Sequence, residues 1–108
     1  MEGNLGEFEL LVLLALVRLG DDAYGVSVQR EIASRSGRDA SFAAVYTTLS
    51  RLETKGFVDS FHGAPTPERG GRSKKHFTLT AAGRTTLQRN LRAIRSMTQG
   101  LDPQWSLS

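Results

Sequence analysis

The residues best suited to chemistry in this 108-residue chain are basic side chains, and most lie in its C-terminal half. Residues 55–108 carry nine basic and three acidic side chains, a net of +6, whereas residues 1–54 carry five and eight, a net of −3. Four of these cations, Arg69, Arg72, Lys74 and Lys75, fall in the stretch 63–75, whose two prolines and three glycines predict a loop. Clustered cations on a loop suit the neutralisation of phosphates in a nucleic acid, with a merely solvated basic surface as the alternative.

A second set of candidate contact residues lies on a predicted helix over residues 42–55, which Ser41 can cap. One stripe of this helix is apolar and consists of Phe42, Val45, Leu49 and Leu52. The opposite face is small and polar and consists of Ala43, Ala44, Thr47, Ser50, Arg51 and Thr54, with Tyr46 and Thr48 on the flanks. Arginine can pair bidentately with guanine, and a threonine methyl can contact a thymine methyl. We therefore expect this face to read DNA, with a phosphate near Ser41. The alternative is that these polar side chains are simply solvated.

Catalysis and metal binding find little support in the sequence. Without cysteine the chain has no disulfide, thiol nucleophile or thiolate ligand. A metal-binding or pH-sensing pair of His62 and His76 across a hairpin is one interpretation, and half-exposed strand histidines are the other. Asp22 has a predicted capping role, and Gly70-Gly71 lacks the strand-to-helix setting of a nucleotide-binding loop. We expect no catalytic residue, no cofactor and no metal site.

The elements that position these residues follow from hydrophobic periodicity and turn residues. Helices are predicted over 5–19, 23–36, 42–55 and 81–99, and strands over 57–62 and 76–79 on either side of the basic loop. The fold class is thus mostly α with a small β-hairpin (α+β), in the element order of a winged helix-turn-helix with a long C-terminal dimerisation helix. We expect residues 1–80 to form a DNA-binding domain, 81–101 a dimerisation helix packed on the same domain, and 102–108 a tail.

The longest apolar run, Leu10–Val17, indicates no membrane association. It has eight residues, whereas a membrane-spanning helix needs roughly 20. No basic region precedes it, as one would in a secretory signal. We therefore expect a cytoplasmic protein.

Two helices carry more apolar surface than a chain of this length can bury. The predicted helix 5–19 is apolar nearly all round, so we expect part of it to pack against a second copy; a central helix in a monomer is the alternative. The helix 81–99 carries a narrow apolar stripe that resembles a coiled-coil seam. The expected dimer interface comprises Leu5, Phe8, Leu11, Leu87, Leu91, Ile94, Met97 and Leu101.

Five segments resemble the PadR family of transcriptional regulators. They are Leu5–Leu16, Tyr24-Gly25, Ala44–Val58, Pro65–Phe77 and Leu79–Gly83. The single helix after them resembles the short-tailed subfamily. The resemblance implies a homodimeric DNA-binding protein, most often a repressor, in which the last helix dimerises with help from the first and Tyr46 approaches the DNA backbone.

The resemblance also implies a small aromatic or cationic effector. Some short-tailed members hold a planar drug between tryptophans of the last helix, but here the matching position is Ile94, and no aromatic residue lies between Phe77 and Trp105. We therefore do not carry that drug site over to this chain. The predicted function is a dimeric regulator on an inverted-repeat operator in double-stranded DNA. The alternative is a winged-helix protein-interaction module, which should show large apolar residues on the outer face of the helix 42–55.

Overall fold

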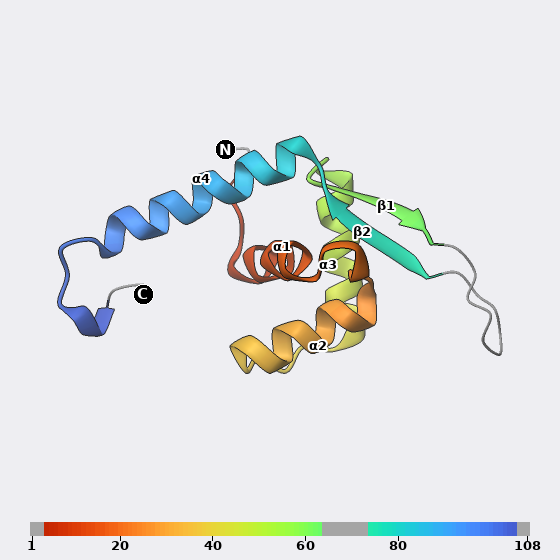
Figure 1. Cartoon of the computed structure of the whole chain (residues 1–108), viewed down its shortest axis with the longest axis horizontal. Coiled ribbons are helices and arrows are strands. Elements are labelled where there is room, and N and C mark those ends of the chain that lie inside the picture. The colour runs from red at the N-terminus through yellow and green to blue at the C-terminus, as the bar shows by residue number, and fades with distance from the viewer. Residues whose placement is uncertain (1–3, 64–73, 106–108) are drawn as a thin grey trace.

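The computed structural model describes residues 4–63 and 74–105, and it has the predicted element order (Figure 1). The elements are α1 (Glu7–Leu19), the 3₁₀ helix η1 (Gly20–Asp22), α2 (Gly25–Ser36), α3 (Phe42–Thr54), β1 (Val58–His62), β2 (Lys75–Leu79), α4 (Ala81–Thr98) and the 3₁₀ helix η2 (Pro103–Trp105). The mostly helical class with one antiparallel hairpin is therefore confirmed. No helix of the described ranges is long and apolar enough to cross a bilayer.

The start of α2 differs from the prediction. Residues 20–22 form a 3₁₀ turn rather than a simple stop, and Tyr24, not Asp22, is the N-cap, whose N–H donates to Ser27 Oγ (2.9 Å). Ala23 and Tyr24 are extended because they lie beside β2: the Phe77 N–H donates to the Ala23 carbonyl (2.9 Å). This segment therefore ties α2 to the hairpin.

The core forms where α1, α2 and α3 meet the hairpin. Its fully buried large side chains are Phe77, Leu13, Leu49, Leu52, Val12, Val28, Val45 and Val58. Not every side of α1 is covered, since Val17 is exposed and Leu10, Leu11 and Leu14 are only partly buried. Burial on one side and surplus apolar surface on the other leave part of α1 available for a partner.

The hairpin pairs Val58 with Leu79 at its base and His62 with Lys75 at its outer end. His76 pairs with Phe61 instead, and the two rings stack with their centroids 5.5 Å apart. Because successive strand residues point to opposite faces, His62 and His76 do not face each other. The interpretation of a histidine pair across the hairpin was wrong.

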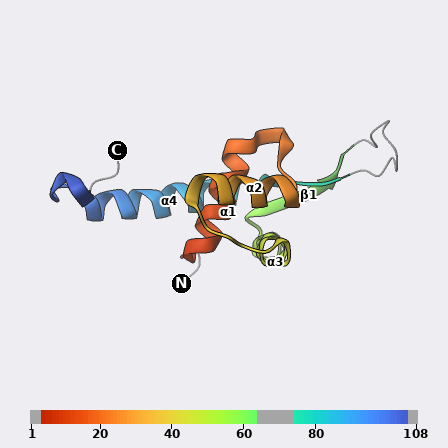
Figure 2. The same ribbon diagram turned by 90° about the horizontal axis from the view of Figure 1, so that it is seen from below.

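The helix α4 starts at a junction with the end of α3 and then leaves the core. Thr80 caps it, accepting from the Gly83 N–H (2.9 Å), and its hydroxyl donates to the Gly56 carbonyl (2.7 Å). Beyond this junction α4 projects from one end of the molecule and the hairpin from the other (Figures 1 and 2). The radius of gyration, 15.4 Å, exceeds the roughly 13 Å of a compact chain of this length.

Candidate nucleic-acid interface

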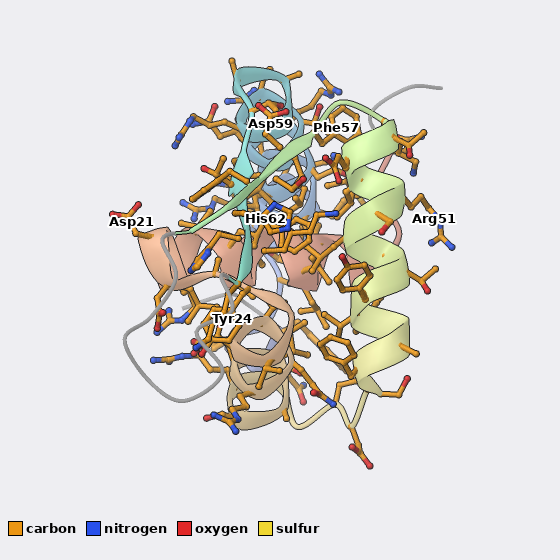
Figure 3. All side chains as sticks on the ribbon, turned by 90° about the vertical axis from the view of Figure 1, so that its right-hand side faces the viewer. Asp21, Tyr24, Arg51, Phe57, Asp59 and His62 are labelled. Carbon is orange, nitrogen blue, oxygen red and sulfur yellow. The ribbon has the colours of Figure 1, made fainter. Side chains whose placement is uncertain are left out.

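The outer face of α3 is open to solvent along its length. Ser41 caps the helix as predicted, its Oγ accepting from the Ala44 N–H (3.0 Å). The exposed residues of the predicted face are Ala43, Ala44, Thr47, Arg51 and Thr54, and Ser50 is half-buried. Figure 3 shows Arg51 directed away from the rest of the molecule. Small side chains with one outward arginine allow this helix to approach a flat or grooved surface closely.

The buried face of α3 differs from the predicted apolar stripe at two positions. Thr48, predicted on a flank, is buried, and Phe42, predicted in the core stripe, is 45% exposed. The Phe42 ring lies against the start of α2, where a Cβ on Gly25 would come within 2.6 Å of its Cε1. The periodicity of α3 alone could not predict this, because it contains no information on how a neighbouring helix crosses.

The turn between α2 and α3 is held by one side chain. Gln29 Nε2 donates to the Ala40 carbonyl (3.0 Å), one residue before the cap of α3. Together with the contact of Phe42 on Gly25, this fixes the angle at which α3 leaves α2. Neither Gln29 nor Gly25 was a predicted site residue; only the small residue at the start of α2 hinted at a close helix approach.

Tyr46 joins α3 to the strand β2 of the hairpin. Its ring is half-buried, edge-on to Phe77 (6.1 Å between centroids) and tilted against Phe42 (5.8 Å). Lys75 Nζ lies 5.6 Å from the centroids of both the Tyr46 and the Phe77 rings. The structure thus places Tyr46 on the edge of the core, with a lysine beside it on the side of the hairpin.

The basic hairpin residues are described only in part. Arg69 and Arg72 lie outside the described residues. Lys74 is exposed, and its Nζ sits 4.3 Å above the Tyr24 ring. A cation–π contact of this kind holds the ammonium in place while leaving its charge at the surface. Lys75 therefore places positive charge beside Tyr46 and α3, whereas Lys74 places its charge beside the start of α2, over Tyr24.

A buried carboxylate sits behind the same helix. Glu9 of α1 accepts from Lys55 Nζ (2.8 Å) through Oε2 and from the Gly6 N–H (3.0 Å) through Oε1. Burial by itself raises the pKa of Glu9, but the hydrogen bonds from Lys55 and Gly6, with the charges of Lys55 and Arg51, lower it overall. The ion pair joins α1 to the end of α3, and no sequence pattern indicated it.

The expected dimer residues fall into two groups. Leu5, Phe8, Leu11 and Leu91 are partly buried against the core, whereas Ile94, Met97 and Leu101 are exposed. Leu87 is only 5% exposed and belongs to the core of its own chain. The first turns of α4 are used internally, so the exposed apolar stripe begins at Ile94, about two helical turns after Leu87.

The sequence matches, over residues 13–89, the family described as the transcriptional regulator PadR-like family. Similar solved structures include a PadR family transcription regulator from Clostridium difficile, with 23% identity and a TM-score of 0.72 over 85% of this chain and 91% of that chain. H. salinarum RosR has 22% identity and a TM-score of 0.70 over 93% of this chain and 83% of that one.

A third similar structure concerns regulation of DNA binding of Bordetella bronchiseptica BpsR by 6-hydroxynicotinic acid. It has 23% identity and a TM-score of 0.66 over 96% of this chain and 73% of that one. No curated protein matched the chain. At these identities, likeness to solved structures shows a shared fold.

Proposed function

The chain belongs to the PadR-like family of transcriptional regulators, and from this premise we propose that it is a homodimeric repressor that binds an inverted-repeat operator in double-stranded DNA. The observation that carries the proposal is the outer face of α3, which is exposed, small and polar and has Arg51 as its single charged residue. Each copy would place α3 in a major groove, with two such grooves about 34–36 Å apart on one side of the duplex.

The proposed DNA contacts divide into base contacts and phosphate contacts. Thr47 and Arg51 would reach base edges, because the small side chains around them let α3 approach the groove floor. Ala43 and Ala44 are those small side chains and would lie close to the base edges. The contacts with the DNA backbone would come from Ser41, Tyr46, Ser50, Arg69, Arg72, Lys74 and Lys75. Most of the affinity would then come from phosphates, and most of the specificity from α3.

The proposed dimer uses the part of α4 that lies beyond the core. Ile94, Met97 and Leu101 are exposed there, and a projecting helix with an apolar stripe is stable when a second copy covers it. A pair related by a two-fold axis presents two copies of α3 to DNA, which matches an inverted repeat. Since its proposed target is the gene-bearing DNA, we also propose a cytoplasmic location.

A small molecule could control this binding. The support is the regulation of BpsR by 6-hydroxynicotinic acid and a 250 Å³ cavity in this chain whose lining includes Phe61, Phe77 and Arg84. Phe77 contacts Tyr46 of α3 edge-on, so a ring compound in this cavity would press on the residue beside the proposed DNA face. We propose this cavity as the site of a single-ring aromatic effector.

A protein-interaction module is the second candidate, and the partial exposure of Phe42 favours it. Phe42 is, however, at the first turn of α3 and already packs on Gly25 and Tyr46. The other outward residues include no large apolar side chain. A face of this composition suits a polar, charged partner better than an apolar one.

Fluorescence anisotropy tests the proposed function. Purified protein is titrated onto duplex DNA from upstream of its own gene and onto scrambled DNA of equal length, across a range of salt concentrations. We expect binding to the native segment to be about a thousandfold tighter at moderate salt. Equal and steeply salt-dependent binding to both would contradict an operator in this segment. An absence of binding at low salt by a folded protein would contradict DNA binding itself.

A further inference from the structure

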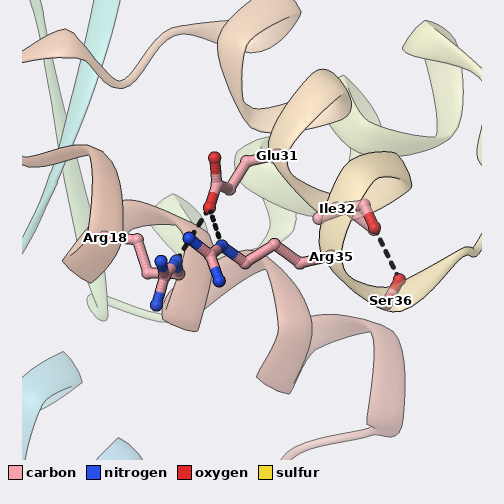
Figure 4. Close-up of polar contacts among 5 residues, drawn as sticks. All are labelled: Arg18, Glu31, Ile32, Arg35 and Ser36. Carbon is pink, nitrogen blue, oxygen red and sulfur yellow. Dashed lines mark hydrogen bonds and ion pairs between the residues drawn. The ribbon is translucent and has the colours of Figure 1, made fainter.

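A groove between α1 and α2 has an apolar floor and a charged edge. Its volume is 240 Å³, and its floor consists of Leu11, Leu14, Ala15 and Ile32. On the edge, Glu31 accepts from the Nε atoms of Arg18 (2.8 Å) and Arg35 (2.9 Å) (Figure 4). Two arginines and one glutamate leave this edge with a net positive charge.

The groove is poorly suited to a free small molecule. Such sites orient their ligands with a few convergent polar groups, and here Arg18, Glu31 and Arg35 are engaged with one another. The apolar floor instead suits a large apolar side chain that is delivered by a chain. The positive edge would favour an occupant with a negative charge next to that side chain.

The turn after α4 carries such a side chain. Gly100, with φ of +80°, ends the helix, and Asp102 folds the next residues: its Oδ1 accepts from the Gln104 N–H (3.2 Å) and its carbonyl from the Trp105 N–H (2.9 Å). Trp105 is nevertheless 63% exposed. Asp102 is the one charged residue between Arg95 and Trp105.

We propose that Trp105 of one copy occupies the α1–α2 groove of a second copy, and reciprocally, with Asp102 beside Arg18 and Arg35. The inference rests on the proposed homodimer and names a contact within it. Each chain supplies this groove and a single tryptophan, so a two-fold pair makes the same contact twice. The exposed Met97 and Leu101 lead along the chain to Trp105, so the contact continues the apolar stripe of α4.

The position of the turn agrees with this pairing. Both ribbon views place η2 beyond the end of α4, and Figure 1 shows it on the side of α4 where α1 and α2 lie. A second copy packed against the projecting part of α4 would bring its own α1 and α2 to this side. By symmetry, its Trp105 would reach the groove of the first copy.

Crosslinking between two single-cysteine chains tests the contact, because the native chain has no cysteine. Ser36 lines the groove, and Gln104 precedes the tryptophan. A Ser36→Cys chain carrying a size tag is mixed with an untagged Gln104→Cys chain and treated with a short bifunctional thiol reagent. We expect a mixed-size product. The matched control, Ser34→Cys, makes the same substitution on the same helix at an exposed position outside the groove lining, and it should give at least tenfold less product.

Trp105 is also the single tryptophan of the chain, so its fluorescence reports on the same site. We expect its emission to shift to shorter wavelength, and acrylamide quenching to fall, as the dimer forms. Trp105→Ala should raise the dimer dissociation constant by roughly 30-fold, as for a buried interface tryptophan, whereas Gln104→Ala should leave it within about threefold.

The outcomes separate the contact from the dimer. The groove contact alone is overturned if the protein is a dimer by sedimentation but acrylamide quenches Trp105 as easily as it does in urea, and Ser36→Cys gives no more crosslinked product than Ser34→Cys. A monomer at all concentrations overturns the dimer and the contact together. The proposal is also overturned if a double variant, Ser36→Cys with Gln104→Cys, crosslinks within a single monomeric chain. That result would show that the groove holds the Trp105 turn of its own chain.

Discussion

Replacing Gly83 with alanine tests the packing at the start of α4, because helix preference and packing predict opposite changes in the free energy of unfolding. In a helix interior, alanine is favoured over glycine by about 0.5–1 kcal/mol. At Gly83, however, a Cβ would lie 2.0 Å from the Phe57 carbonyl oxygen and 2.9 Å from its carbon. Both atoms are backbone, so neither can rotate away. The clash is relieved only if the start of α4 moves off the segment that follows α3.

The size of the effect follows from what that movement disrupts. Overpacking costs about 1–3 kcal/mol, and the Thr80 N–H would lose its hydrogen bond to the Phe57 carbonyl (3.1 Å), worth about 0.5–1.5 kcal/mol. After the gain in helix preference is subtracted, we expect Gly83→Ala to lower the free energy of unfolding by roughly 2 kcal/mol.

Urea denaturation at a fixed protein concentration measures this change, since the stability of a dimer depends on concentration. Ala82→Gly is the matched control: it lies one residue earlier, is exposed, and should cost only the helix preference of about 0.5–1 kcal/mol. A Gly83→Ala protein as stable as the unmodified chain, or more stable, would refute the close approach of α4 to Phe57.

Three further predictions concern the proposed DNA face and its support. Arg51→Ala should weaken operator binding by roughly 1–3 kcal/mol and relax preference at one base pair; an equal loss on scrambled DNA in the anisotropy titration would assign Arg51 to phosphate instead. Replacing Lys74 and Lys75 with glutamine should weaken binding on every sequence and reduce the slope of log K against log salt by about one unit per lost contact, and an unchanged slope would remove both lysines from the interface. Because its neighbours lower the pKa of Glu9 below the ordinary 4.5, its ionised form stabilises the fold fully above that pH, and this contribution is lost as pH falls through the lower folded pKa. Urea titrations from pH 7 to pH 3 should therefore show a shallower acid loss for Glu9→Gln, and parallel curves for the two proteins would contradict that role.

Local patterns in the sequence predict most of the elements and the outer face of α3. Hydrophobic period and turn residues locate the four helices and two strands within a few residues, because those signals are local. Ser41 is a typical example: a capping residue before an apolar stripe marks the start of a helix, and the structure places its hydroxyl on the Ala44 N–H. The proposed DNA contacts themselves stay predictions.

What the sequence did not predict depends on packing between distant segments. Phe42 follows the apolar period of its helix, yet the start of α2 holds its ring partly outside the core. Leu87 continues the stripe of the last helix, yet the core buries it. Glu9 and Lys55 are 46 residues apart, and no periodicity links them. Each of these facts follows from how elements cross, which a single-chain pattern does not encode.

The junction at Thr80 has a mechanical consequence for the proposed dimer. Within two or three residues it joins the end of α3, the base of the hairpin and the start of α4, so it connects the proposed DNA-contacting helix to the proposed dimerisation helix. With 18 residues, α4 is about 27 Å long, and a tilt of about 5° at its start moves its far end by roughly 2 Å. That displacement is more than half the rise of one base pair, about 3.4 Å. Small sequence changes at this junction should therefore alter the operator spacing that the proposed dimer accepts, while the proposed DNA-contacting residues and the apolar stripe stay the same.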